Sequence, residues 1–146
     1  MTQGERGGDR VGRKREFAAA MEYWGFDYRV LDFPDLGLIF IDLKRMVEEV
    51  AEIILKKRLS LLVSFDPREI TFGFDHPDHN RAGEVTRVAG MLTSKKWPKL
   101  YFWTSLGKNS RTEERVKYLK QFYKSQYKSE YSMILKQIGE SYIKVR

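Results

Sequence analysis

Apolar residues recur with helical spacing in the first third of the chain and predict two helices there. Residues 13–24 place Phe17, Ala20, Met21 and Trp24 on one face, and Gly25 follows as a typical terminator. A second helix is predicted over residues 42–57, because Asp42 is a favourable N-cap and basic residues close the stretch. Its predicted buried stripe consists of Leu43, Met46, Val47, Val50, Ile53 and Ile54.

The same spacing predicts two more helices in the second half of the chain. Residues 77–92 begin with Pro77, which fits the first helical position because its missing N–H has no partner to lose there. The residues predicted to point inward are Ala82, Val85, Val88, Ala89 and Leu92. Residues 112–137 predict a long helix of mixed polar and aromatic character.

Short apolar runs between these segments predict strands. Residues 28–33 form a β-type run that ends at Pro34, and residues 100–104 and 142–145 are further candidates. Residues 59–65 form an apolar run with serines at positions 60 and 64, which we interpret as a parallel strand that is covered on both faces. Strands that alternate with helices predict an α/β layer fold with a mainly parallel sheet. The length of 146 residues predicts a single domain.

Composition limits the kind of protein and the kind of site. No apolar run approaches the roughly 20 residues of a membrane-spanning helix, and the Gly- and Arg-rich start has no apolar signal-peptide core. A cytoplasmic location is therefore expected. The chain has no cysteine, so disulfides and thiolate ligands are excluded. A bound metal would be held by His, Asp or Glu, and such mixed nitrogen and oxygen ligands suit zinc.

Positive charge is concentrated near the C-terminus. Residues 1–94 carry 14 basic and 16 acidic side chains, whereas residues 95–146 carry 13 and 4, with many aromatic residues among them. Such a segment could bind nucleic acid through phosphate contacts and base stacking. No nucleic-acid-binding motif accompanies the charge, so we favour a solvated lysine face with aromatic residues turned inward.

The only two histidines lie in the sequence Asp75-His76-Pro77-Asp78-His79. This cluster follows the predicted strand at residues 59–65 and opens the predicted helix at residues 77–92. In α/β sheets, ligand sites collect at the carboxyl ends of the strands. We therefore predict a metal or catalytic site here; the alternative is a polar helix start with two surface histidines.

His76–Ala82 has the sequence H-P-D-H-N-R-A, and Leu31–Leu38 has the sequence L-D-F-P-D-L-G-L. These segments resemble the H-P-D-H-x-A motif and the strand with its F-P-D-G-x-L turn in the PIG-L/LmbE-type zinc deacetylases. Three further segments match in order along the chain: Thr2–Gly8 resembles the T-x-G-E-x-G loop, Arg13–Ala20 with Gly25 resembles the R-x-x-E helix, and Lys124–Gln126 resembles H-x-S-Q, with Tyr123 in place of the histidine.

This resemblance implies a Rossmann-like three-layer fold and hydrolysis of the N-acetyl group of an amino sugar such as N-acetylglucosamine. By motif position, His79 would be a zinc ligand and His76 would stabilise the tetrahedral oxyanion. Asp78 would orient a histidine. Glu5 and Arg13 would contact the sugar.

The chain also departs from the family pattern. No histidine precedes His76, so the H-P-D-D motif with its two metal ligands and general base is missing, as are the family's first strand, first helix and second strand. We therefore expect residues 1–146 to form a single incomplete deacetylase-like domain with impaired activity. An open sheet edge and an uncovered apolar face are expected as well, and they favour self-association into homo-oligomers. The alternative function is a non-catalytic binding or assembly module that uses the basic aromatic C-terminal region.

Overall fold

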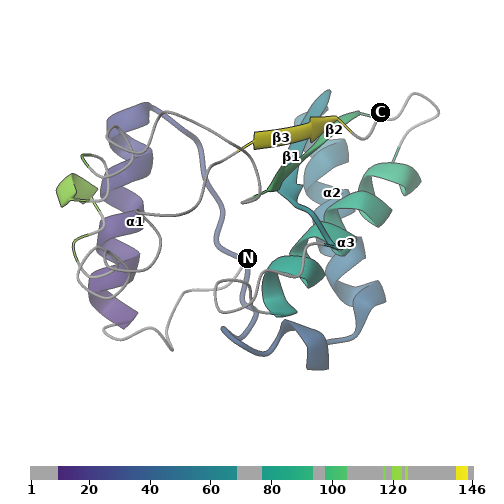
Figure 1. Cartoon of the computed structure of the whole chain (residues 1–146), viewed down its shortest axis with the longest axis horizontal. Helices are drawn as coiled ribbons and strands as arrows, with labels where there is room; N and C mark the ends of the chain where they lie inside the picture. The colour runs from purple at the N-terminus through teal and green to yellow at the C-terminus, as the bar shows by residue number, and fades with distance from the viewer. Residues whose placement is uncertain are drawn as a thin grey trace. The chain divides into compact units, whose positions relative to one another are not determined.

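The computed structural model describes residues 10–68, 77–93, 98–104, 117, 120–122, 124 and 141–144. Its elements are α1 (Arg10–Trp24), η2 (Leu38–Phe40), α2 (Leu43–Lys57), β1 (Leu61–Phe65), α3 (Pro77–Leu92), β2 (Lys99–Thr104) and β3 (Ser141–Lys144) (Figure 1). Contacts divide the chain into two compact units, residues 1–35 with 108–139 and residues 36–107 with 140–146. The prediction of one domain stays a prediction. Across the described residues, no helix is both long and apolar enough to span a bilayer.

The first unit is built on α1, which ends as predicted. Gly25 adopts a left-handed conformation with φ of +65°, and the Phe26 amide donates to the Met21 carbonyl at 2.9 Å. These are the features of a glycine-terminated helix. Ala20 is fully buried, whereas Trp24, which was predicted to lie on the same face of the helix, is 53% exposed. Trp24 is the last helical residue, and burial of this face does not extend to it.

The predicted strand at residues 28–33 is not formed. Leu31 and Phe33 are buried with Asp32 exposed between them, so the alternation of an extended segment is present. Phe33 makes a single isolated β-bridge, however, and no ladder extends from it among the residues that the structure describes. Pro34 follows directly and lacks the N–H that would continue a ladder. The segment instead packs on α1 through Tyr28, whose ring meets Phe17 edge to face at 5.2 Å.

The second unit contains a three-stranded sheet in the order β1-β2-β3. Strands β1 and β2 are parallel, with Leu62 opposite Leu100, and β3 is antiparallel to β2. Helix α3 connects the parallel pair and contacts β1, β2, η2 and α2, so it lies between the sheet and α2 (Figure 1). This arrangement confirms the α/β class and the parallel pairing of the predicted strands.

Helix α2 agrees closely with its prediction. Asp42 is the N-cap and its carboxylate accepts a hydrogen bond from the Arg45 amide at 3.0 Å, which satisfies a backbone donor at the helix start. Met46, Val47 and Ile54 are buried, and α2 packs against α3. The amphipathic pattern therefore predicted both the helix and the face it buries.

Helix α3 has the predicted bounds, and glycines bring it close to the sheet. A Cβ atom on Gly83 would collide with the Phe65 carbonyl oxygen and would lie 3.0 Å from the Pro67 nitrogen. Val85 and Ala89 are fully buried, as predicted. Leu92 was predicted to point inward and is 71% exposed, because it is the final helical residue and lies past the buried part of α3.

Strand β1 lies at an edge of the described sheet, with β2 as its neighbour on one side. Leu62 is buried, but Leu61 and Val63 are 52% and 56% exposed. The prediction that this strand is covered on both faces was therefore wrong, because α3 covers one face and leaves these two side chains open. The expected open edge with an uncovered apolar face agrees with this geometry. Self-association stays a prediction.

The basic C-terminal region lies largely outside the described residues. Lys117, the segment 120–122 and Lys124 are helical, within the helix predicted over residues 112–137. Phe122 packs against Tyr23 of α1, with ring centroids 4.7 Å apart. Tyr23 is itself 61% exposed, so the inward orientation of the aromatic residues in this segment stays a prediction. Binding of nucleic acid or of a protein partner by the whole segment stays a prediction.

Candidate functional site

The candidate site is built on the first turn of α3. Asp78 is 4% exposed and lies where the helix dipole favours a negative charge. Its Oδ1 accepts a hydrogen bond from the Leu38 amide at 3.0 Å, across 40 residues of sequence. Its Oδ2 is also buried and has no hydrogen-bond partner among the described residues. The carboxylate therefore ties η2 to the start of α3 and keeps one oxygen available.

His79 lies directly after this carboxylate, at the carboxyl end of β1. Its ring stacks on Phe65, the last residue of the strand, with centroids 4.1 Å apart and planes within 8° of parallel. Gly83, one turn further along α3, meets the backbone of the same strand end. The strand end and the helix start thus hold the imidazole in a defined orientation. The predicted location at the mouth of the sheet agrees with this position.

The other predicted site residues are not tested by this geometry. His76 and Glu5 lie outside the described residues. Arg13 is a partly buried residue of α1 and belongs to the first unit, whereas Asp78 and His79 belong to the second. The roles assigned to these residues stay predictions.

The side chains that could hold a metal do not form a metal centre in the described part of the chain. No group of three or more His, Asp or Glu residues comes together there. His79 is stacked on a phenyl ring, and Asp66, the nearest carboxylate after β1 in the sequence, is paired with Arg68 at 3.2 Å. A catalytic zinc ion takes three protein ligands. The described donor set therefore does not fit zinc, and the zinc prediction depends on the family resemblance.

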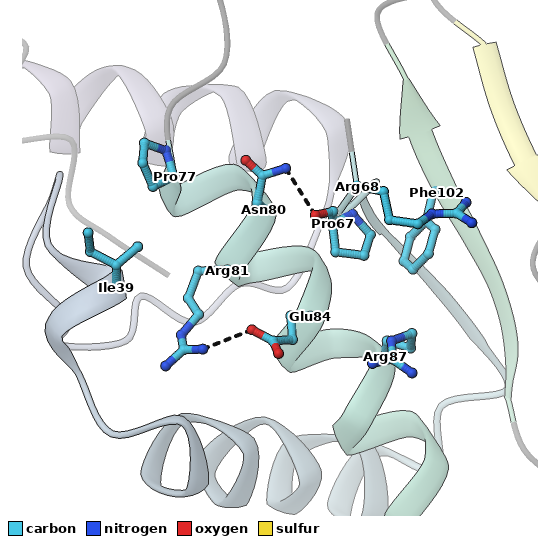
Figure 2. A pocket seen from close by; sticks show the side chains of 9 residues that line it. All are labelled: Ile39, Pro67, Arg68, Pro77, Asn80, Arg81, Glu84, Arg87 and Phe102. Carbon is cyan, nitrogen blue, oxygen red and sulfur yellow. Dashed lines mark hydrogen bonds and ion pairs between the residues drawn. The ribbon is translucent and has the colours of Figure 1, made fainter. Parts of the chain in front are cut away.

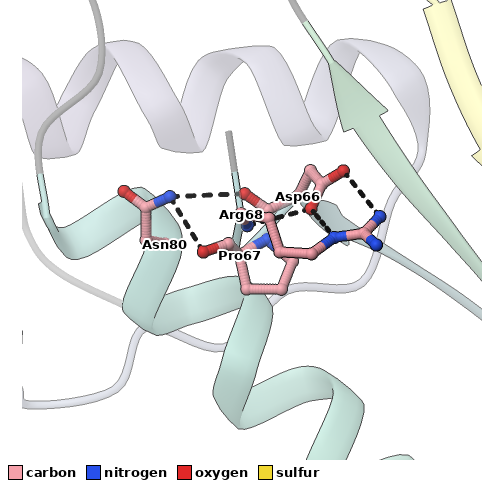
Figure 3. A network of polar contacts seen from close by, with 4 residues as sticks. All are labelled: Asp66, Pro67, Arg68 and Asn80. Carbon is pink, nitrogen blue, oxygen red and sulfur yellow. Dashed lines mark hydrogen bonds and ion pairs between the residues drawn. The ribbon is translucent and has the colours of Figure 1, made fainter. Parts of the chain in front are cut away.

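The turn after β1 contains a polar network that the sequence analysis did not predict (Figure 3). Asp66 accepts hydrogen bonds from the amide and the Nε of Arg68 at 2.9 and 3.2 Å, and its other oxygen accepts from Nη2 at 3.3 Å. Asn80 of α3 donates to the Pro67 carbonyl at 3.1 Å. An aspartate that binds the amide two residues ahead is a common turn signal, which could have revealed the first half of this network. The network fixes the turn against α3.

The ion pair changes the titration of Asp66. Burial by itself raises its pKa, but the hydrogen bonds and the positive charge of Arg68 outweigh burial and hold the pKa below its usual value. A carboxyl group with a lowered pKa stabilises the fold at pH values above its pKa in the unfolded chain. That contribution is lost as the pH falls through the lower pKa of the folded state.

The Arg68→Gln variant is expected to raise the pKa of Asp66, since burial then acts without the cation. The stability difference from the parent should be present above about pH 4 and should shrink as the pH falls further. The difference should be small, because the Arg68 side chain is 76% exposed and solvent screens its charge. NMR titration of the Asp66 carboxyl carbon and urea unfolding at several pH values measure both effects. Arg45→Gln on α2 is the control and should leave the pKa of Asp66 unchanged.

A cavity of about 650 Å³ lies beside this turn (Figure 2). Four apolar residues contribute to its lining, namely Ile39, Pro67, Pro77 and Phe102. Its polar lining consists of Asn80 and Glu84 together with Arg68, Arg81 and Arg87, and we call this cavity the arginine pocket. Neither Asp78 nor His79 is among the residues that line it.

Comparison with known proteins identifies the family. The family model described as "PIG-L: GlcNAc-PI de-N-acetylase" matches residues 1–90, which is more than half of the chain and includes Asp78 and His79. The chain belongs to the PIG-L family. Membership in this family indicates a deacetylase-like function and a small-molecule substrate. No curated protein matches the chain in the comparison that was made.

A solved structure supports the fold of this PIG-L family member. The conserved protein TT1542 from Thermus thermophilus is similar, with a TM-score of 0.65 and 20% sequence identity. The alignment covers 100% of this chain and 79% of the other. At this identity the likeness concerns the fold, and it confirms the Rossmann-like α/β architecture inferred from the sequence.

Proposed function

We propose that this chain is a PIG-L-type hydrolase that removes the N-acetyl group of an amino sugar, with N-acetylglucosamine-type compounds as the substrate class. The observation that carries the proposal is the place of the family motif in the fold. Asp78 and His79 stand on the first turn of α3, and His79 is stacked on the last residue of a parallel strand. Substrates of α/β proteins bind at this end of the sheet.

The proposed roles follow the family motif. His76 stabilises the oxyanion that forms when the amide carbonyl is attacked, as an aimed N–H donor does in acyl transfer. Asp78 orients a histidine, and its unpartnered Oδ2 supports this role because a buried carboxylate oxygen needs a donor. Glu5 and Arg13 bind the sugar. His79 is proposed as a zinc ligand.

The metal part of the proposal is limited to that single ligand. One imidazole without two further protein ligands holds zinc weakly, and the described residues do not add the others. We therefore assign no catalytic step to a metal, and we expect the 146-residue chain by itself to bind zinc weakly and to release acetate slowly.

The His79→Ala variant tests the proposal. Zinc binding is measured by calorimetry, and acetate release from N-acetylglucosamine is followed with and without added zinc. Removing the imidazole should weaken both by roughly tenfold or more. Glu52→Ala, on the exposed face of α2, is the control and should match the parent. Equal zinc affinity in the parent and His79→Ala, or no zinc binding by the parent, would contradict the assignment of His79.

A further inference from the structure

The arginine pocket has the size and lining of a small-molecule site. Pockets that bind such ligands commonly enclose about 300–1,000 Å³, and this one measures about 650 Å³. Pro67 contributes an apolar surface to the lining, and Phe102 beside it is almost fully buried, with 1% exposure. The polar part of the lining has three arginines and one glutamate, so positive charge is in excess.

Two of the three arginines are partly satisfied by the protein. Arg68 uses Nε and Nη2 on Asp66. Arg81 donates from Nη1 to Glu84 at 2.8 Å and from Nη2 to the Ile41 carbonyl at 3.2 Å. The remaining donor of Arg81, Nε, is buried and has no hydrogen-bond partner in the part of the chain that the structure describes. A buried donor without an acceptor costs free energy, but Nε is closed to solvent and both Nη atoms are engaged, so Arg81 contributes positive charge to the cavity rather than free donors.

The third arginine lacks a carboxylate partner among the described residues. The contact of the Arg87 guanidinium is with Met91 Sδ at 3.7 Å, and a thioether sulfur is a weak acceptor. Arg87 thus lines the cavity with unused donors and with a charge that no described carboxylate compensates. The guanidinium group matches the oxygens of a phosphoryl group, which can accept from two nitrogens at once.

We propose that the arginine pocket binds a phosphomonoester of a small ring compound. Arg87 holds the phosphoryl oxygens, Arg68 and Arg81 add to the positive potential, and the ring lies on Pro67. The pocket uses the α3 positions 77, 80, 81, 84 and 87, whereas His79 and Gly83 face β1 from another side of the helix. His79 is therefore not part of the pocket, and this proposal does not rest on the proposed function.

Calorimetric titration of the whole chain at constant ionic strength tests this proposal. The ligands are glucose-6-phosphate, glucose and inorganic phosphate. Saturable binding of glucose-6-phosphate is expected, with weaker binding of inorganic phosphate and none of glucose. Arg87→Gln should weaken the binding of glucose-6-phosphate roughly tenfold, the usual effect of losing a charged hydrogen-bond donor. Arg45→Gln removes the same charge from the surface of α2 and should have no effect, and His79→Ala should have none either.

Three results would overturn the proposal. Equal weakening by Arg87→Gln and Arg45→Gln would mean that the basic chain attracts the anion without a site. If inorganic phosphate binds as tightly as glucose-6-phosphate, the pocket does not contact the sugar ring. Absence of saturable binding of glucose-6-phosphate would exclude the site itself. Circular dichroism of each variant verifies that the helices are retained.

Discussion

The Gly83→Ala variant is expected to lose about 2 kcal/mol or more of the free energy of unfolding. Alanine improves helix propensity by at most about 1 kcal/mol at an interior position. The new methyl group, however, would overlap the Phe65 carbonyl oxygen and would lie 3.0 Å from the Pro67 nitrogen and 3.1 Å from the Phe65 carbonyl carbon. Backbone atoms cannot rotate away as a side chain does. Helix α3 must therefore move away from β1, and urea unfolding measures the cost.

Gly90→Ala is the matched control in the same helix. A methyl group at this position would lie 3.0 Å from Leu62 Cδ1 and 3.7 Å from Pro98 Cγ, and the leucine side chain can adjust. The gain in helix propensity offsets that adjustment, so the net change should stay within about 1 kcal/mol. A Gly83→Ala variant as stable as the parent, or less perturbed than Gly90→Ala, would show that α3 does not approach the strand end as described.

Displacement of α3 should also reach the candidate site. His79 lies one turn before Gly83 and stacks on Phe65, whose carbonyl is the atom that the new methyl group meets. The ring-current shifts of the His79 protons in NMR spectra are expected to decrease in Gly83→Ala and to persist in Gly90→Ala. This measurement separates a local change at the site from a general loss of stability.

The second large effect is expected for the Asp78→Ala variant, which should lose about 2 kcal/mol of the free energy of unfolding. Oδ1 of Asp78 is the acceptor for the buried Leu38 amide, so truncation leaves that donor without a partner. The favourable interaction of a carboxylate with the helix start, typically about 0.3–1 kcal/mol, is lost too. Release of the buried charge offsets part of this cost. Hydrogen exchange at the Leu38 amide is expected to accelerate at least roughly tenfold relative to the parent.

Asp78→Asn is the control for the hydrogen bond, since its side-chain carbonyl can still accept from the Leu38 amide. Exchange protection at that amide should be retained, and the stability loss should be limited to about 1 kcal/mol from the missing charge. If the Leu38 amide stays protected in Asp78→Ala, the described hydrogen bond does not account for its protection. Zinc or substrate binding that is lost in Asp78→Asn with the fold intact would support the orienting role of the carboxylate.

The parts of the fold that depend on residues close together in the sequence were predictable from the sequence alone. The start of α3 follows from Pro77, and the end of α1 follows from Gly25, because each residue restricts its own backbone. The N-cap of α2 depends on a contact between Asp42 and an amide three residues away. The placement of His79 at the strand end was also predictable. The loop and the helix that follow a parallel strand begin at the edge of the sheet where that strand ends.

Other features depended on contacts that no local pattern specifies. Residues 31–33 alternate like a strand, yet in the described part of the chain Phe33 makes an isolated bridge without a ladder, because a strand also needs a neighbour that continues the pairing. The apolar run of β1 predicted burial on both faces, but exposure of Leu61 and Val63 depends on which elements lie over each face. Apolar character shows that a side chain can be buried and does not identify what would cover it.

The sequence alone determined the order of helices and strands in the second unit and the family motif that places a carboxylate and an imidazole on the first turn of α3. Tertiary structure decided what these groups contact. Asp78 binds an amide 40 residues away, and the arginines of the pocket come from a turn and a helix that the sheet brings together. Backbone preferences act over a few residues, whereas partners across the fold are selected by packing of the whole unit, which the local pattern does not encode.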